Sequence, residues 1–143
     1  MVDVGAKAAT ARTAIAEGRV RLSPHAWKLL SAQANAKGEV LNTARIAGIM
    51  AAKRTPDLIP LCHPIAIAKV AVEFEVRETE IGIEATVGTT DVTGVEMEAL
   101  TAVAVAGLTL HDMIKAVDPA AVLSEVRVER KEGGKTGLWE RPV

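Results

Sequence analysis

A histidine lies in a short proline-bounded segment, Leu61-Cys62-His63-Pro64, directly before a predicted strand. Imidazole titrates near neutral pH, so His63 could act as a general acid, a general base or a donor to phosphate. The alternative is a histidine that only bonds a loop carbonyl. Cys62 is a poor candidate for a nucleophile paired with His63, because neighbouring side chains along an extended segment point to opposite sides.

A second group of ionisable residues marks the two ends of a predicted helix that is otherwise apolar, between Val95 and Val117. Glu96 and Glu98 lie in its first turn, while Asp112 and Lys115 lie near its last turn. Helix ends explain such charges without any chemistry, because acids suit the positive N-terminal end and a lysine suits the negative C-terminal end. Asp112 and Lys115 are three residues apart and could be a simple surface ion pair.

Several cations lie in loops or at predicted element ends, where they could converge on a polyphosphate. They are Arg12, Lys37, Lys53, Arg54 and Lys135. Exposed lysines at such places are usually only solvated, and the Gly-rich run at 133–137 lacks the frame of a P-loop. The chain has no CxxC, HExxH or carboxylate-rich cation loop, so we expect no metal site and no cofactor.

Length and charge limit the class of protein. A chain of 143 residues suits one domain, 1–143, and a net charge of −1 gives no overall electrostatic attraction to nucleic acid or to an anionic membrane. The longest apolar stretch, 99–110, is well short of the ~20 residues of a membrane helix. One cysteine and no signal-peptide pattern at the start predict a reducing, cytoplasmic location.

The core must consist mainly of Ala, Val, Ile and Leu, because the chain has one Phe, two Trp and no Tyr. Small side chains bury less area per residue, so a domain of this size gains from burying further surface between subunits. We therefore expect a homo-oligomer.

Hydrophobic periodicity predicts the elements that position these residues. Helices are expected from Pro24 to a stop at Lys37-Gly38, over 39–54, and from about 95 to 117. Strands are expected weakly over 13–22, as a hairpin of 65–76 and 81–87, and over 122–130. This order predicts an α+β, ferredoxin-like fold, an antiparallel sheet with helices packed on one face.

Longer motifs give the chain a likeness to a known family. They are Leu61-Cys62-His63-Pro64 within 44–64, Glu96-Met97-Glu98 within 93–103, and the shorter runs at 1–4, 112–116 and 133–137. In these motifs, which span essentially the whole chain, the sequence closely resembles the MoaC family. It departs from the family pattern at His111, Ile114, Thr136 and Leu138.

The resemblance implies a lyase of molybdenum cofactor biosynthesis. Its substrate would be 3′,8-cyclo-7,8-dihydro-GTP, supplied by a radical enzyme, and its products cyclic pyranopterin monophosphate and pyrophosphate. It implies Lys53, His63, Glu98, Asp112 and Lys115 in the site, with Arg12, Lys37, Glu96, Met97 and Lys135 near it. We interpret Asp112 and Lys115 as an acid/base pair. Lys37, Lys53 and His63 would bind phosphate or donate protons, while Met97 and Glu98 would hold the base.

The resemblance also implies a hexamer built as a trimer of dimers. Glu98 and Asp112 are fourteen residues apart, or ~21 Å along a helix axis. Two such helices packed antiparallel would bring the start of one near the end of the other, so we expect each site to draw on two chains. The small residues Ala99, Ala102, Ala106 and Gly107 would allow this approach.

Two other functions are compatible with the residues. Ferredoxin-like domains host many functions, so a non-catalytic nucleotide-binding oligomer is the main alternative, and turnover of the cyclised GTP separates it from the enzyme. An RNA-binding module is the weaker alternative, because its sheet needs stacking aromatic side chains and the predicted strands hold only Phe74.

Overall fold

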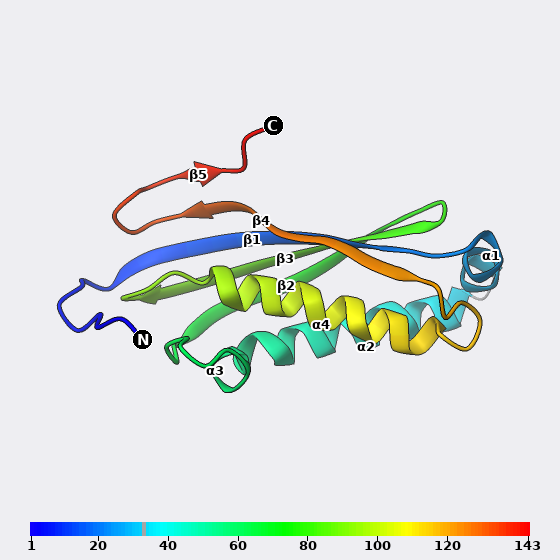
Figure 1. The fold of residues 1–143 in the computed structure, drawn as a ribbon, viewed down its shortest axis with the longest axis horizontal. Helices are drawn as coiled ribbons and strands as arrows, with labels where there is room; N and C mark the ends of the chain where they lie inside the picture. Colours follow the sequence, from blue (N-terminus) through cyan, green and yellow to red (C-terminus); the bar gives the residue numbers. More distant parts are fainter. Residues whose placement is uncertain (33) are drawn as a thin grey trace.

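The computed structural model describes residues 1–32 and 34–143, and it confirms the α+β, ferredoxin-like arrangement. Antiparallel strands form one sheet in the order β2-β3-β1-β4-β5, and the long helices α2 and α4 pack on one of its faces (Figure 1). The elements are β1 (Thr10–Arg21), α1 (Pro24–Ala32), α2 (Ala34–Lys53), α3 (Thr55–Leu58), β2 (Ile67–Arg77), β3 (Glu80–Asp91), α4 (Glu96–Ile114), β4 (Val122–Glu132) and β5 (Trp139–Glu140).

The core lies between the sheet and the two long helices. Alternate residues of β1, among them Ala14, Ala16 and Val20, are buried, as the period of a strand with one covered face requires. Gly18 belongs to the same row, and a Cβ atom there would lie 2.6 Å from Cγ1 of Val103 on α4. The absence of a side chain at Gly18 therefore lets α4 approach the middle strand closely.

Helix α4 is the central helix of the fold. By length and hydropathy alone it could span a membrane, but half of it is buried, and it packs on β1, β3, β4 and α2. Ala99, Ala102, Ala106 and Gly107 are all buried within the chain, with Gly107 directly under Leu123 of β4. The prediction that these small residues face a partner helix is therefore wrong: they let α4 approach its own sheet and α2.

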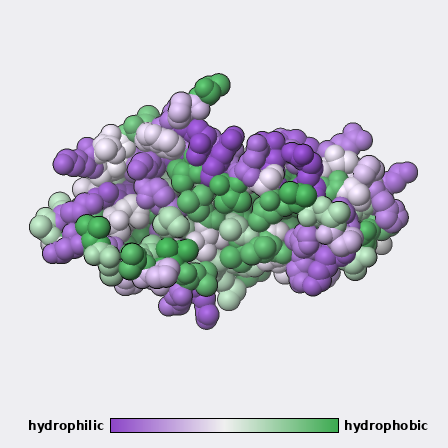
Figure 2. Space-filling view, viewed as in Figure 1, coloured by the Kyte–Doolittle hydropathy of each residue, from purple (hydrophilic) through white to green (hydrophobic). Residues whose placement is uncertain are grey.

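The other face of α4 carries partly exposed apolar residues. Met97, Leu100, Ala104 and Leu108 recur every three or four residues, which places them on one side of the helix. We call this row the α4 stripe. Leu108 is 60% exposed. Figure 2 shows hydrophobic residues over the middle of the molecule, where α2 and α4 lie in Figure 1.

The start of the second helix differs from the prediction. The first helix ends at Ala32 and α2 already begins at Ala34, so Gly38 lies inside a helix and does not end one. A single glycine costs a helix only about 1 kcal/mol relative to alanine, and α2 packs extensively on α4. Tertiary packing thus overrides the stop signal. The one-turn helix α3 and the two-residue strand β5 were not predicted from the sequence.

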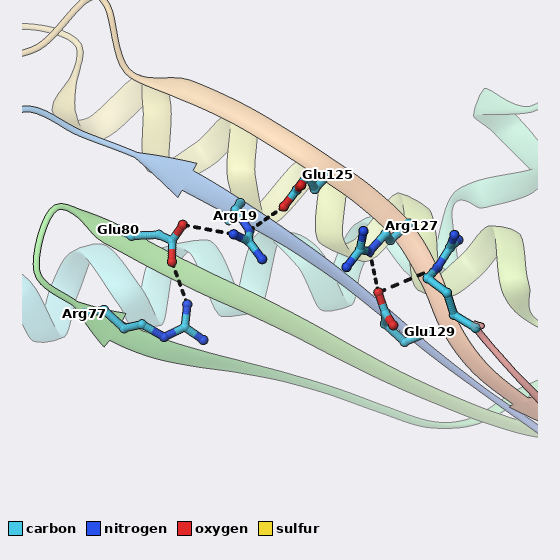
Figure 3. Close-up of polar contacts among 7 residues, drawn as sticks. Arg19, Arg77, Glu80, Glu125, Arg127 and Glu129 are labelled. Carbon is cyan, nitrogen blue, oxygen red and sulfur yellow. Dashed lines mark hydrogen bonds and ion pairs between the residues drawn. The ribbon is translucent and has the colours of Figure 1, made fainter. Parts of the chain in front are cut away.

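The sheet face opposite the helices is charged (Figure 3). Arg19 bridges Glu80 at 3.4 Å and Glu125 at 2.7 Å, and Arg127 pairs with Glu129 at 2.5 Å. A cavity of about 240 Å³ lies there, but none of the predicted site residues lines it. This face is therefore a solvated layer of ion pairs, away from the candidate chemistry.

Candidate active site

Two adjoining cavities meet where α4 begins. At this end of the molecule Figure 1 shows the start of α4, the helix α3 and the turn that follows β4. Both cavities are lined by Thr93, Gly94 and Glu96. Six of the ten predicted site residues line one or both cavities: Arg12, His63, Glu96, Met97, Glu98 and Lys135.

The first cavity, of about 280 Å³, lies between the start of α4 and the segment 59–63. We call it the Glu98 cavity. His63, Met97 and Glu98 line it, together with the apolar side chains of Ile59 and Leu61. A largely apolar hollow with a few polar groups suits a flat heterocycle that is held by specific hydrogen bonds.

Glu98 is the most deeply buried charged group of this cavity. Its side chain is 1% exposed, and burial raises the pKa of Glu98 above its ordinary value. Its own backbone N–H and the thiol of Cys62, 3.7 Å from Oε2, donate hydrogen bonds that oppose this rise. Burial, and then the charge of Glu98, raise the pKa of the Cys62 thiol, so Cys62 keeps its proton and is a hydrogen-bond donor here, not an activated nucleophile.

The second cavity, also of about 280 Å³, lies between the start of α4 and the turn after β4. We call it the cation cavity. Four basic side chains line it: Lys7, Arg12, Lys131 and Lys135. No described side chain caps the start of α4. The first N–H groups of a helix have no partner within the helix and favour an anion, so both features suit phosphate.

Lys7 and Lys131 are functional candidates that the sequence analysis missed. Lys131 lies on β4 beyond the predicted end of that strand, and its Nζ atom is 3.5 Å from Oε1 of Glu96. Lys7 precedes β1 in a loop. No local pattern marks either lysine, because the cavity forms only when β1, β4 and α4 meet.

Glycines shape the wall of the cation cavity. Gly134 has φ +72°, and a Cβ atom there would lie 2.2 Å from Nη1 of Arg12. Arg12 itself is fixed by donating to the carbonyl oxygens of Asp91 at 3.1 Å and Val92 at 3.4 Å. A side chain at this position would have to displace the Arg12 guanidinium, so glycine lets the turn after β4 pack against it, and Lys135 of the same turn lines the cavity.

The predicted acid/base pair lies at the opposite end of α4. Lys115 Nζ is 2.8 Å from Asp112 Oδ1, and both side chains are exposed. The hydrogen bond and the charge of each partner raise the pKa of Lys115 and lower that of Asp112. The two groups form an ordinary ionised pair within one chain, and the length of α4, ~1.5 Å per residue, separates them from Glu98.

Lys53 lines neither cavity. Lys53 is exposed in the last turn of α2. The side chain of Lys37 lies outside the described residues. One chain therefore gathers six of the ten predicted residues at one end and exposes Asp112 and Lys115 at the other.

Comparison with known proteins gives a consistent result. A model described as "MoaC family" matches residues 1–134. The chain is 60% identical to the cyclic pyranopterin monophosphate synthase of Streptomyces avermitilis, over 99% of this chain and 83% of the relative. It is 59% identical to a protein of the same name from a Nocardioides species, over 99% of this chain and 89% of the relative. A Mycobacterium tuberculosis relative, named cyclic pyranopterin monophosphate synthase 2, is 59% identical over 99% of this chain and 84% of its own length.

Proposed function

This chain belongs to the MoaC family, and we propose that it is a lyase of molybdenum cofactor biosynthesis. It converts 3′,8-cyclo-7,8-dihydro-GTP into cyclic pyranopterin monophosphate and releases pyrophosphate. The observation that carries this proposal is the family match over residues 1–134, which includes both cavities up to Gly133. A radical enzyme that cyclises GTP is the functional partner, because it supplies the substrate.

The cation cavity suits the triphosphate. Four basic groups gathered beside an uncapped helix start offset the charge that develops on pyrophosphate as it leaves. Arg12 and Lys135 are the predicted members of this group, and Lys7 and Lys131 complete it. Glu96 lies at the junction of the two cavities, and its carboxylate forms an ion pair with Lys131. This ion pair would fix the position of Glu96 beside the substrate.

The Glu98 cavity suits the purine-derived ring. Met97 offers an apolar contact surface, and the Glu98 carboxyl can accept hydrogen bonds from ring N–H groups. His63 lines the same cavity and can donate a proton or a hydrogen bond to the phosphate that becomes cyclic. Because the cavities share a wall, one molecule can place its ring in the first and its phosphates in the second.

A second copy of the chain completes the site in this proposal. Asp112 and Lys115 continue the three-to-four-residue spacing of the α4 stripe, so the stripe leads directly from Met97 to them. An exposed apolar row of this kind favours an interface. Two α4 helices packed antiparallel on their stripes would bring Asp112 and Lys115 of one copy near the Glu98 cavity of the other.

Asp112 and Lys115 serve as the acid/base pair of the proposed reaction. Within a single chain the Asp112–Lys115 pair is exposed and ionised, so Lys115 carries a proton that it can donate. Contact with a second copy would remove water from the pair, and burial lowers a lysine pKa, which eases the transfer of that proton. Lys53, and Lys37 by family resemblance, bind phosphate. The assembly proposed is a cytoplasmic hexamer, a trimer of dimers.

Direct detection of products tests the proposal. Purified protein is incubated with 3′,8-cyclo-7,8-dihydro-GTP, and cyclic pyranopterin monophosphate and pyrophosphate are measured by mass spectrometry and an enzymatic assay. We expect the two products in equal amounts. Binding of the cyclised GTP without either product would favour a non-catalytic nucleotide-binding oligomer instead.

A further inference from the structure

The carboxyl group of Glu98 is buried with few hydrogen-bond donors around it. Its side chain is 1% exposed, and no described lysine or arginine forms an ion pair with it. Two donors reach it, its own backbone N–H and the Cys62 thiol at 3.7 Å from Oε2. A buried carboxylate without a cation depends on such hydrogen bonds, so the loss of one of them should change its ionisation.

We propose that Cys62 is a positioning residue, whose thiol donates a hydrogen bond that orients Glu98 in the cavity and sets the balance between its ionised and protonated forms. This inference rests on the proposed function, in which Glu98 contacts the ring of the substrate. Cys62 lines the same cavity as Glu98, so both groups lie beside the space that the ring would occupy.

The chemistry of a thiol explains why cysteine suits this position. Burial and the adjacent carboxylate raise the pKa of Cys62, so the sulfur keeps its proton and remains a donor. A thiol is a weak donor compared with a hydroxyl or an ammonium group. It therefore stabilises the ionised carboxylate only partly and leaves Glu98 able to take up a proton.

Other titratable groups near Glu98 must be distinguished from Cys62. Glu96 on the same helix also raises the pKa of Glu98. His63 lines the same cavity, and Lys131 of β4 pairs with Glu96. The end of α2 and the adjoining α3 carry Lys53, Arg54 and Asp57, all of them exposed. A test must therefore change Cys62 alone.

The titration of Glu98 in the full-length protein measures the effect of the thiol. Carboxyl carbons of ¹³C-labelled glutamate are followed by NMR as the pH changes, and Glu98→Gln identifies the signal. We expect the Glu98 midpoint to rise by roughly half to one pH unit in Cys62→Ala, which has no donor, and to fall in Cys62→Ser, whose hydroxyl is a stronger donor. Ile59→Val, which trims the same cavity without a polar change, should leave the midpoint unchanged.

The pH dependence of kcat/KM then links the hydrogen bond to the reaction. The limb that belongs to Glu98 should move upward in Cys62→Ala and downward in Cys62→Ser, which a purely structural role would not produce. An unchanged Glu98 titration in both variants overturns the inference, and so does a shifted titration with an unshifted kcat/KM profile. Failure of the unaltered protein to form product rejects the proposed function separately, because the titration requires no turnover.

Discussion

Asp112 and Lys115 form an exposed ion pair at the end of α4. Because the pair is exposed, mutating either residue can test its role in the reaction with little effect on the stability of the fold. Within one chain little packs against either side chain, so truncation leaves no cavity in the subunit and removes only a solvent-screened contact. A change at either residue that stops the reaction would therefore act through chemistry.

We expect Lys115→Ala and Asp112→Ala each to abolish product formation while the thermal unfolding midpoint stays close to that of the unaltered protein. Circular dichroism and the product assay measure the two properties. Glu78→Ala, in the exposed turn between β2 and β3, is a matched control that should keep full activity. Normal turnover in either site variant would remove the proposed acid/base pair.

Glu98 gives the stability of the fold a predictable pH dependence. Its pKa is raised in the folded chain, so the folded state binds more protons than the unfolded state between the two pKa values. Stability contributed by this group is present below the unfolded pKa and is lost as the pH rises through the folded pKa.

Glu98→Gln cannot ionise, so its stability relative to the unaltered protein should increase as the pH is raised from about 4 to 8. Urea denaturation at several pH values measures this difference. Glu78→Gln, at an exposed position, should show no such trend. If the difference in unfolding free energy between Glu98→Gln and the unaltered protein stays constant with pH, burial does not raise the pKa of the Glu98 carboxyl.

At the scale of the elements, the backbone conformation of the turn after β4 determines how closely this turn packs against Arg12 in the cation cavity. Gly134 and Gly137 both have positive φ, +72° and +65°, but only Gly134 lies against Arg12. A Cβ atom at Gly137 would meet nothing within 4 Å. Alanine at Gly137 would therefore introduce backbone strain alone, whereas alanine at Gly134 would introduce the same strain and also displace Arg12.

Both Gly134→Ala and Gly137→Ala should lose about 1 kcal/mol of stability from the left-handed backbone. Only Gly134→Ala should also raise KM, by roughly tenfold, because the methyl group displaces the Arg12 guanidinium and weakens phosphate binding. Steady-state kinetics with the cyclised GTP would measure this. Equal KM values in the two variants would mean that Arg12 does not contact the phosphates.

Local patterns predicted the elements better than their mutual contacts. Ser23-Pro24 marked the start of α1, where the Ser23 hydroxyl accepts a bond from the Ala26 N–H at 3.1 Å. The period-two run around Val72 likewise indicated β2. Helical spacing could not decide whether Ala102 faced its own sheet or another chain, because a small residue suits either neighbour. Lys7 entered the site only through tertiary structure.

At the scale of the whole molecule, the two ends of α4 belong to different regions of one chain. The Glu98 cavity lies at the start of the helix and the Asp112–Lys115 pair at its end. The α4 stripe between them is the surface on which we expect a second copy to pack. The proposed site is therefore a property of the pair of chains.

Mixing two inactive variants tests this arrangement. Glu98→Ala and Lys115→Ala subunits, refolded together, should regain part of the activity, because one of the two sites in each mixed dimer keeps both groups. Differently tagged subunits and tandem purification verify that mixed oligomers form. Unaltered protein mixed with either variant serves as the positive control. Verified mixed oligomers as inactive as their parents would place both groups in a site within one chain.

Because α4 carries Glu98 near one end and Lys115 at the other, the proposed dimer also predicts how an inactive subunit would affect intact subunits in the same assembly. In a symmetric pair, each helix would supply Glu98 to one site and Lys115 to the other. A subunit that lacked both groups would therefore silence both sites of any dimer that it entered, its intact partner included. Such a chain would be a dominant inhibitor of the assembly, and the remaining activity would fall with the square of the intact fraction.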